Sequence, residues 1–505
     1  MIIQQSTLVE GSRMMEKWKN PKYKMQFKVW VYSVKNPDEI LGGAVPQLSP
    51  SGPYVSEAGN GTVTFKRKVL YHFNENDSCQ TCILGNRVWV PNIIYQKFVE
   101  VASRPEMRAA AATLIAQTPF LELEVGDLLF RGYKDPFLEN FCDLPVANIV
   151  CSTIFEMPER IGLFFGFNDT YVEGEYTIKD GTNDINERAD VIAFNGMPVL
   201  RKEWWDEEKA REIRGSEGTL FHPFIDKGEA LWTYASQLCR SIKLLFVGET
   251  TYEDVPLYRF QVPPEEFDTS SPDQTGFCHP NEKLMFSHQK ESSNTKHCYP
   301  RGILSVARCR PNEPPVVISL PNFNYATDEV RQSVNGLNET DDSRDAILVD
   351  VHPDLGIAFR ALRHIQLNVE FWAGKDIVLP VHHQRQRSTL IPIAIVHDDA
   401  EIDADSLAMV KNELILARKL AYGSTTLLLL SALSVLSLSA LYGLYRVYVE
   451  NPESAASSTT ELYDDPLASM RPKVKITEGS TVKRPGWSEL GSSESDNQIR
   501  PSNYI

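Results

Sequence analysis

The stretch that decides how this chain is organised is residues 425–445, which reads TTLLLLSALSVLSLSALYGLY and carries no charged side chain. A helix of these 21 residues rises about 1.5 Å per residue and spans roughly 30 Å, the thickness of the hydrocarbon layer of a bilayer. The alternative is a buried core helix, but soluble helices seldom run this long without a charge. We therefore interpret the stretch as a transmembrane helix, preceded by Arg418 and Lys419 and ended by Arg446.

Three serines of this stretch, Ser431, Ser434 and Ser437, fall within an arc of about 120° on a helix. Small polar residues at such spacing often face another helix in the membrane. Alternatively, each hydroxyl donates a hydrogen bond to its own helix backbone, which is common in membrane helices. The sequence leaves both interpretations open.

Two signals that require the lumenal or extracellular side precede the membrane stretch. The first is an even number of cysteines, which suggests disulfides in an oxidising compartment rather than free thiols in the cytosol. They are Cys79, Cys82, Cys142, Cys151, Cys239, Cys278, Cys298 and Cys309. The second signal is a set of four N-x-S/T sequons, which accept glycans. Their asparagines are Asn60, Asn76, Asn168 and Asn338.

These signals predict three parts of the chain. Residues 1–420 form a lumenal or extracellular ectodomain, residues 425–445 the transmembrane helix, and residues 446–505 a cytoplasmic tail. The tail is rich in serine and proline and poor in aromatic residues, so we expect it to be disordered. Residues 1–40 contain no apolar run of the kind that a signal peptide needs. We therefore expect either a targeting helix upstream of this sequence or a protein that is not exported.

The composition and net charge of the chain disfavour several classes of ligand. Hydrophobic residues make up 42% of the chain and charged residues 23%, which is enough for a packed core. The net charge of −16 gives no basic footprint for a nucleic acid. An acidic surface also disfavours strongly anionic ligands, unless a local basic patch overrides the sum.

Short β-rich runs separated by turn signals occupy most of the ectodomain and predict a large antiparallel sheet or barrel. The spacing of apolar residues becomes helical at residues 91–103 and 105–117. A proline opens each of these two predicted short helices. The first helix has an apolar stripe of Ile94, Phe98 and Val101. Such a stripe usually packs onto the rest of the fold.

No catalytic or cofactor-binding motif is present. The chain has no phosphate-binding loop, dinucleotide fingerprint, nucleophile elbow or zinc-protease motif. Cys79 and Cys82 form a C-x-x-C, which we interpret as a local disulfide or two separate bridges rather than a redox or zinc site. Histidines and aspartates near the end of the ectodomain could be metal ligands, but loose histidines in polar loops are usually solvated, so we expect no metal. They are His382, His383, His397, Asp398 and Asp399.

Taken in order along the chain, several short motifs resemble the class B scavenger receptor family, which includes platelet glycoprotein IV and the lysosomal integral membrane proteins. The family-like motifs are Glu10-Gly11 with Trp18, Asn36-Pro37, Gly52-Pro53-Tyr54, Gly132-Tyr133-Lys134-Asp135-Pro136, Cys239-Arg240-Ser241, Pro256 to Phe260, Phe277-Cys278, Ser319 to Pro321, Asp350 to Pro353, Gly356 and Gln366 to Asn368. Each motif alone is weak, but their order and the membrane helix that follows make the resemblance specific.

The resemblance implies an α+β fold with a large antiparallel β-barrel-like ectodomain, an apical helical bundle and an internal lipid tunnel. It implies two membrane helices with both termini cytosolic, and a helix upstream of this sequence. It also implies the disulfides Cys239–Cys309 and Cys278–Cys298. Proximity in sequence alone suggests Cys142–Cys151 and Cys79–Cys82.

This chain also departs from the family pattern. The usual proline-histidine is Pro321-Asn322 here, and the apical region carries Lys97, Arg104 and Arg108 without the lysine pair tied to oxidised-lipoprotein binding in one member. That specificity is therefore not carried over.

The sequence and the resemblance together favour a receptor that binds lipids (fatty acids, sterols, phospholipids) or lipoproteins and passes lipid through the tunnel to the membrane. Ile94, Phe98 and Val101 would then lie at the tunnel mouth. The alternative is a protein-binding receptor, a lysosomal hydrolase carrier or an adhesion receptor, that uses the same apex. An enzyme is disfavoured because no constellation supports one. We expect an integral protein of the plasma membrane, with the lysosomal membrane as the alternative.

Overall fold

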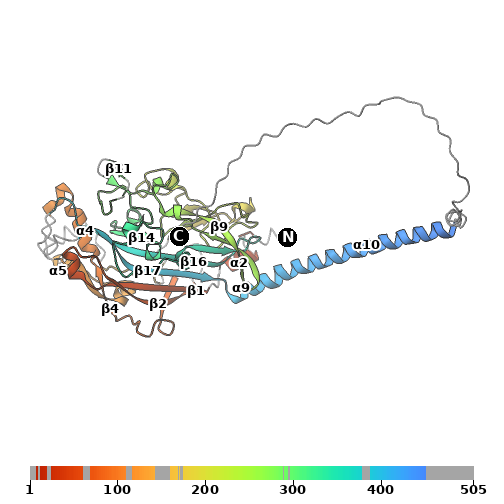
Figure 1. The fold of residues 1–505 in the computed structure, drawn as a ribbon, viewed down its shortest axis with the longest axis horizontal. Coiled ribbons are helices and arrows are strands. Elements are labelled where there is room, and N and C mark those ends of the chain that lie inside the picture. The colour runs from red at the N-terminus through yellow and green to blue at the C-terminus, as the bar shows by residue number, and fades with distance from the viewer. Residues whose placement is uncertain are drawn as a thin grey trace, which may run out of the picture. The chain divides into compact units, whose positions relative to one another are not determined.

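The computed structural model describes residues 7–8, 12–19, 24–60, 69–109, 117–142, 160–168, 170, 174–287, 289, 291–293, 296–377 and 387–450. The chain divides into two compact units, Met1–Arg418 and Lys419–Ile505. The first unit combines sheets with short helices, and the second contains one long helix (Figure 1). The expected mixed fold with a C-terminal apolar helix is confirmed.

Eleven strands form the main sheet of the first unit, in the order β3-β2-β1-β17-β16-β15-β10-β9-β8, with β14 pairing β16 and β13. Every pairing is antiparallel. The strands are β1 (Lys24–Val34), β2 (Leu48–Asn60), β3 (Val69–Asn74), β8 (Leu231–Ala235), β9 (Arg240–Tyr252), β10 (Val255–Gln261), β13 (Leu304–Ser305), β14 (Val316–Ser319), β15 (Leu348–Val351), β16 (Ala358–Phe371) and β17 (Thr389–Glu401).

Within the described residues this sheet does not close, so the expected barrel is corrected to an open sheet. A barrel requires its first and last strands to pair. Here β3 pairs with β2 and β8 with β9, and the two end strands do not meet. The strand that follows β3 in the chain, β4 (Arg87–Pro91), pairs instead with β5 (Phe120–Glu124) in a separate two-stranded sheet.

Smaller elements surround the main sheet. Two further strand pairs are β6 (Tyr176–Ile178) with β7 (Val191–Phe194) and β11 (Glu291–Ser293) with β12 (Lys296–His297). The α-helices of the first unit include α2 (Arg13–Lys19), α3 (Pro37–Leu41), α4 (Ile93–Ala102), α5 (Pro136–Cys142), α7 (Asp328–Arg331), α8 (Asp342–Asp345) and α9 (Ala404–Met409). In Figure 1, α4 and α5 lie at the end of the unit opposite α2 and α9. We call the end with α4 the apical end.

Strand β16 is central to the sheet, and both of its faces are covered toward its end. Alternate residues of a strand point to opposite faces. Four polar side chains, His364, Gln366, Asn368 and Glu370, share one face and are 5%, 0%, 0% and 1% exposed. We call this row the polar row of β16.

Hydrogen bonds satisfy the middle of the polar row. Gln366 Nε2 donates to Asn368 Oδ1 at 2.8 Å, and Asn368 Nδ2 donates to Ser319 Oγ at 3.0 Å. Gln366 Oε1 accepts the backbone N–H of Asn322 at 2.9 Å. Asn322 has a φ of 56°, a left-handed conformation that asparagine tolerates better than most residues. The polar row therefore holds the turn that contains Asn322 in place.

Three disulfides join described residues: Cys239–Cys309, Cys278–Cys298 and Cys79–Cys82. The first two are the pairings that the resemblance implied. The first links the start of β9 to a 3₁₀ turn that lies 70 residues later in the chain. The suggested pair Cys142–Cys151 cannot be placed, because Cys151 lies outside the described residues.

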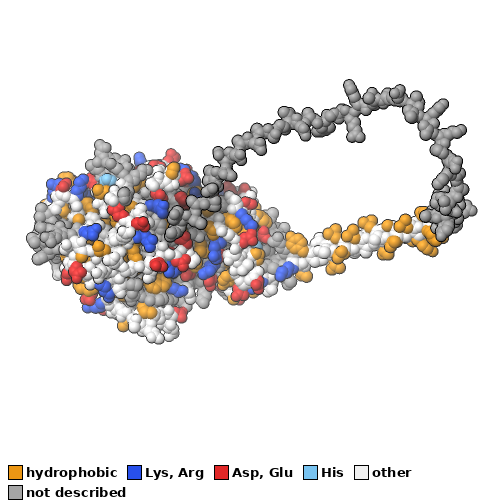
Figure 2. Space-filling view, in the orientation of Figure 1, with side chains coloured by type: hydrophobic (Ala, Val, Ile, Leu, Met, Phe, Trp, Pro, Cys, Tyr) orange, Lys and Arg blue, Asp and Glu red, His pale blue; other side chains and the backbone are white. Residues whose placement is uncertain are grey.

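Helix α10 (Leu416–Glu450) begins in the last residues of the first unit, and its part in the second unit, Lys419–Glu450, is long and apolar enough to cross a membrane. Figure 2 shows hydrophobic side chains along this helix and interspersed acidic and basic side chains on the visible face of the first unit. The helix contains residues 425–445 and continues through residues 446–450, which the sequence had placed in the tail. The rest of the expected tail, residues 451–505, lies outside the described residues.

The serines of the membrane stretch bond their own helix. The hydroxyls of Ser431, Ser434 and Ser437 donate to carbonyl oxygens three residues earlier at 2.8, 2.7 and 2.8 Å. Of the two interpretations that the sequence left open, the structure shows the backbone-bonded one.

We predict that the long-range disulfide stabilises the first unit more than the local one does. In the chain-entropy model, removing Cys239–Cys309 with two alanines costs about 4 kcal/mol, whereas removing Cys79–Cys82 costs about 2 kcal/mol. Denaturant unfolding of the purified protein would measure both losses. A larger loss for the Cys79–Cys82 variant would contradict this prediction.

Candidate functional site

Helix α4 is the first of the two apical helices that the sequence predicted, and it begins two residues later than expected. Asn92 caps it, since its Oδ1 accepts the backbone N–H groups of Ile94 at 2.9 Å and Tyr95 at 3.1 Å. The cap satisfies two of the donors that the first turn of a helix leaves without partners. An asparagine directly before an apolar periodic run is a signal that could have given this boundary from sequence.

The apolar stripe of α4 packs into the core. Ile94, Phe98 and Val101 are 3%, 2% and 6% exposed. The Phe98 ring packs edge-on against Phe137 with centroids 5.5 Å apart, and Trp372 belongs to the same cluster. This burial is what an amphipathic helix gains most from. The role of these three side chains in lipid entry stays a prediction.

The second apical helix, predicted over residues 105–117, is described only near its ends. Residues 105–109 form a 3₁₀ turn, and residues 110–116 lie outside the described residues. Gln117 is 5% exposed. The pairing of two apical helices therefore stays a prediction.

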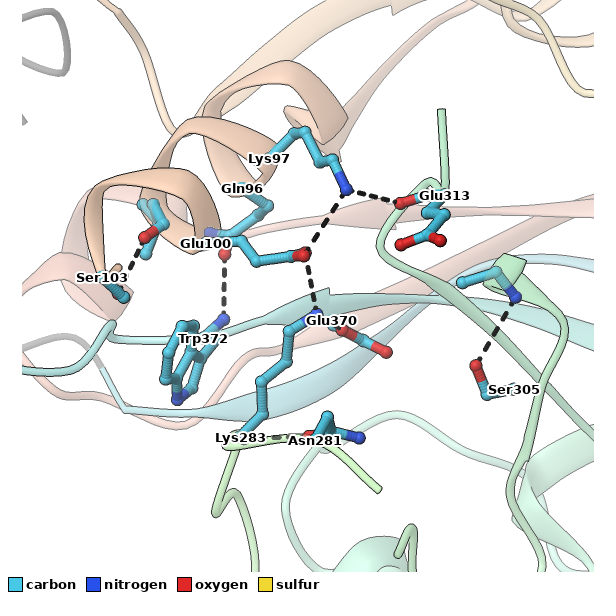
Figure 3. Close-up of polar contacts among 12 residues, drawn as sticks. Gln96, Lys97, Glu100, Ser103, Asn281, Lys283, Ser305, Glu313, Glu370 and Trp372 are labelled. Atoms are coloured by element: carbon cyan, nitrogen blue, oxygen red, sulfur yellow. Dashed lines mark hydrogen bonds and ion pairs between the residues drawn. The ribbon is translucent and has the colours of Figure 1, made fainter. Parts of the chain in front are cut away.

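The polar side of α4 is covered as well, and it fastens the helix to the rest of the unit (Figure 3). Gln96 Oε1 accepts the backbone N–H of Trp372, directly after β16, at 2.9 Å. Lys97 Nζ donates to the backbone carbonyl of Glu313 at 2.9 Å. The sequence has polar residues at these positions but gives no sign that they are buried.

A group of buried charges lies between α4 and β16, as Figure 3 shows. Lys283 Nζ is 3.1 Å from a carboxylate oxygen of Glu100 on α4 and also pairs directly with Glu370 of the polar row. The Tyr299 hydroxyl donates to Glu370. The side chains of Lys283, Glu100 and Glu370 are only 12%, 20% and 1% exposed. One lysine therefore links carboxylates from the apical helix and the central strand.

The pKa of Glu100 reflects two opposing effects. Burial alone would raise it, but the charges of Lys283 and Lys97 outweigh burial and hold the pKa below its ordinary value. Burial would lower the pKa of Lys283, but Glu370 and Glu100 raise it above its ordinary value. Because folding lowers the pKa of Glu100, its charge stabilises the fold above its unfolded-state pKa, and that stability is lost as the pH falls through the folded-state pKa.

Two of the three cations that the sequence placed at the apex face solvent. The side chains of Arg104 and Arg108 are 55% and 50% exposed, whereas that of Lys97 is 14% exposed. Arg108 lies 3.6 Å from Asp376. We define the apical face as the exposed residues Arg104, Glu106, Arg108 and Asp376.

A second polar cluster joins His397 and Asp399, two of the residues considered as metal ligands, to His364 of the polar row. His364 Nε2 lies 2.7 Å from Asp399 Oδ1, and its Nδ1 contacts the carbonyl oxygen of Arg344. Both ring nitrogens of His364 therefore have an oxygen atom as partner. The possible ligand atoms of His364, His397 and Asp399 lie within 4.8 Å of one another, so among the described residues these three side chains are a candidate metal site. The remaining candidates, His382 and His383, lie outside the described residues.

His397 stacks on His364, with ring centroids 3.6 Å apart. Burial and the neighbouring His364 lower the pKa of His397 to about 3. At neutral pH the His397 ring is therefore neutral. The sequence missed His364 because it reaches this cluster from a different strand, directly opposite His397 in the β16–β17 register.

Three sequon asparagines, Asn76, Asn168 and Asn338, have exposed side chains. The Asn168 Oδ1 accepts the backbone N–H of Tyr71 at 2.7 Å, which leaves its amide nitrogen for a glycan. Asn60 is the last residue of β2, and its side chain is not among those described.

We predict that Lys283→Met lowers the free energy of unfolding by about 3–5 kcal/mol, because Glu100 and Glu370 would stay buried without their cation. Denaturant unfolding at neutral pH would measure the loss. The matched control is Lys375→Met, which removes a lysine whose side chain is 42% exposed and pairs with Glu282 at 3.2 Å. It should change the stability by less than about 1 kcal/mol. Equal losses in the two variants would contradict the role of the buried charges.

Comparison with known proteins gives one consistent result. A profile described as the CD36 family matches residues 1–442. Lysosome membrane protein 2 of Rattus norvegicus is 26% identical over 419 residues, which cover 80% of each chain. Scavenger receptor class B member 1 of Rattus norvegicus is 27% identical over 383 residues, 71% of this chain and 68% of the relative.

A third relative is the sensory neuron membrane protein 1 of Antheraea polyphemus, 24% identical over 446 residues, 83% of this chain and 80% of the relative. The family match covers the described sheet, the apical helix α4 and most of α10. The resemblance to class B scavenger receptors is therefore confirmed. This chain belongs to the CD36 family.

Proposed function

We propose that this protein is a class B scavenger-type receptor that binds lipids or lipoproteins at its apical end and passes lipid through a tunnel in the ectodomain to the membrane. The observation that carries this proposal is the family match over residues 1–442, which includes both the sheet unit and most of the apolar helix α10. The lipid classes proposed are fatty acids, sterols and phospholipids.

The proposed topology places the first unit outside the cytoplasm, α10 in the membrane and the tail inside. Three exposed sequon asparagines and three disulfides in the first unit support this side assignment. The plasma membrane is the proposed location, and the lysosomal membrane is the alternative.

Lipid transfer of this kind needs no catalysis. Each methylene of an acyl chain gains about 0.8 kcal/mol when it leaves water, so a continuous apolar path offers a downhill route to the bilayer. The proposal therefore includes no enzyme chemistry, cofactor or metal. Because the stripe of α4 is packed, lipid would have to enter beside this helix rather than along its stripe.

A protein ligand at the apex is the second candidate. The apical face carries both signs of charge at solvent-exposed positions, Arg104 and Arg108 beside Glu106 and Asp376. Exposed charges of both signs give specificity in protein recognition. The firm attachment of α4 would keep such a surface in one shape.

We predict that the sequon asparagines are lumenal and that at least two of them carry glycans in the native protein. Endoglycosidase treatment should therefore increase its gel mobility. Substituting Asn76, Asn168 and Asn338 with glutamine should remove most of the shift. An unchanged mobility, or a glycan on the tail, would refute the topology.

We predict that cells expressing the native protein take up a fluorescent fatty acid and an ether-linked lipid faster than control cells. The ether-linked lipid should enter as fast as its ester, because transfer breaks no bond.

The double variant Arg104→Gln, Arg108→Gln should keep its surface level and lose several-fold in the binding of anionic lipoprotein. The matched control removes two exposed charges elsewhere, by Arg201→Gln and Lys202→Gln.

The two candidate functions give different results in this assay. Unchanged lipid uptake together with lost binding of a protein ligand in the apical variant would favour the protein receptor. Uptake no faster than in control cells at normal surface levels would overturn the lipid proposal.

A further inference from the structure

Three side chains with metal-binding atoms meet on one face of the main sheet, at the opposite end of the polar row of β16 from Glu370. His397 of β17 lies directly opposite His364 in the register of the two strands. Asp399 follows His397 by two positions on β17, so its side chain points to the same face. The pairing of two neighbouring strands therefore gathers two imidazoles and a carboxylate, whose possible ligand atoms lie within 4.8 Å of one another.

His364 is held in the orientation that a metal ligand needs. Its Nδ1 contacts the backbone carbonyl oxygen of Arg344, and a carbonyl oxygen only accepts a hydrogen bond, so Nδ1 carries a proton. Ligating histidines almost always donate their other ring nitrogen to an oxygen in this way. The second nitrogen, Nε2, lies 2.7 Å from Asp399 Oδ1. Two atoms with lone pairs at this distance need a positive centre, which is either a second ring proton or a metal cation.

His397 can supply the second imidazole without losing a hydrogen bond. Its ring stacks on His364 and lies against Trp30, with ring centroids 3.6 and 4.3 Å apart. Its nitrogens make no hydrogen bond within the part of the chain that the structure describes. The χ2 torsion of histidine is broad, so the ring can turn and direct a nitrogen at a cation. With zinc–ligand distances of about 2.0–2.2 Å, tetrahedral ligand atoms lie about 3.3 Å apart, so each ligand atom needs to move only a small distance.

Burial decreases from one side of the cluster to the other. The side chain of His364 is 6% exposed and that of Asp399 is 21% exposed, and His397 is half-buried. A cation can therefore enter from the side of His397 and Asp399, with His364 as the inner ligand. Three protein ligands leave a fourth position for water, as in zinc sites that keep an open position.

The surrounding charges determine how strongly a cation can bind. Asp399 supplies one negative charge, and the Arg344 guanidinium pairs with Asp345 at 2.8 Å. Lys28 of β1 lies opposite His397 in the β1–β17 register, and its charge acts on both His397 and Asp399. It makes no ion pair among the described residues. Lys28 therefore weakens the binding of a cation at this cluster, because like charges repel.

We propose that His364, His397 and Asp399 bind a zinc ion or a similar divalent transition-metal cation. Imidazole nitrogens suit such metals, whereas Ca²⁺ and Mg²⁺ take oxygen ligands. The metal would stand between His364 Nε2 and Asp399 and join β16 to β17 through their side chains. The site shares no residue with α4 or the apical face, so it goes beyond the proposed lipid function and either proposal can fail without the other.

Titration of the full-length protein with zinc tests the site, after removal of metals with a chelator and in competition with a chromophoric zinc indicator. We expect one saturable site and a zinc-dependent rise in the melting temperature. Ca²⁺ should not displace the zinc. His397→Phe keeps an aromatic ring for the stack on His364 and removes both ring nitrogens. It should weaken zinc binding at least about tenfold, since loss of even an outer partner of a metal site costs about 10–100-fold.

Two further variants give the test a control and an opposite sign. The double variant His382→Gln, His383→Gln removes the adjacent histidines that the sequence also offered as ligands, and it should leave the zinc affinity unchanged. Lys28→Met removes the repelling charge and should strengthen zinc binding several-fold, which a purely structural role of the cluster would not produce.

Three results would overturn the proposal. They are the absence of saturable zinc binding, equal affinity in His397→Phe and the native protein, and loss of binding in the His382, His383 double variant with retention in His397→Phe. The melting temperature of metal-free His397→Phe shows whether it folds. If it does not fold, Asp399→Asn decides instead, because it removes the charged ligand and keeps an oxygen acceptor for His364.

Discussion

The fold depends on the burial of four polar side chains along one face of β16. A buried polar group must find partners, because an unsatisfied one costs more than a typical hydrogen bond contributes. His364, Gln366, Asn368 and Glu370 therefore each fix a different segment of the chain. They hold in turn the Asp399 carboxylate, the loop at Asn322, Ser319 at the end of β14, and Lys283. The central strand thus positions its surroundings by hydrogen bonds as well as by packing.

The apical helix shows the consequence of this arrangement. Lys283 joins Glu370 at one end of the polar row to Glu100 on α4. Two backbone N–H groups that follow β16 donate to side chains at this helix, Gln96 of α4 and Ser103 directly after it. With its stripe packed against Trp372 and its polar side bonded to the sheet, α4 is attached to the rest of the unit on both sides. Arg104, Glu106 and Arg108, which follow the helix, stay exposed.

Charges lie in two different environments in this protein. At the apical face they are exposed, so water and salt weaken each pair. Between α4 and β16 the charges of Lys283, Glu100 and Glu370 are largely buried, so the loss of one partner would leave the others without compensation. The net charge of −16 does not distinguish these two environments.

The sequence by itself determined the membrane helix, most strands and the family. These signals are local, because a charge-free run of membrane length or an alternating β run needs no knowledge of distant residues. Only the tertiary structure decided three other features. They are that the sheet stays open within the described residues, that α4 is buried, and that His364 contacts Asp399. The stripe of Ile94, Phe98 and Val101 has the same sequence pattern whether it lines a tunnel or packs on Phe137. Whether a face of a helix is covered depends on segments that lie far away in the chain. For α4 these segments include Trp372 and Lys283, which contact Gln96 and Glu100.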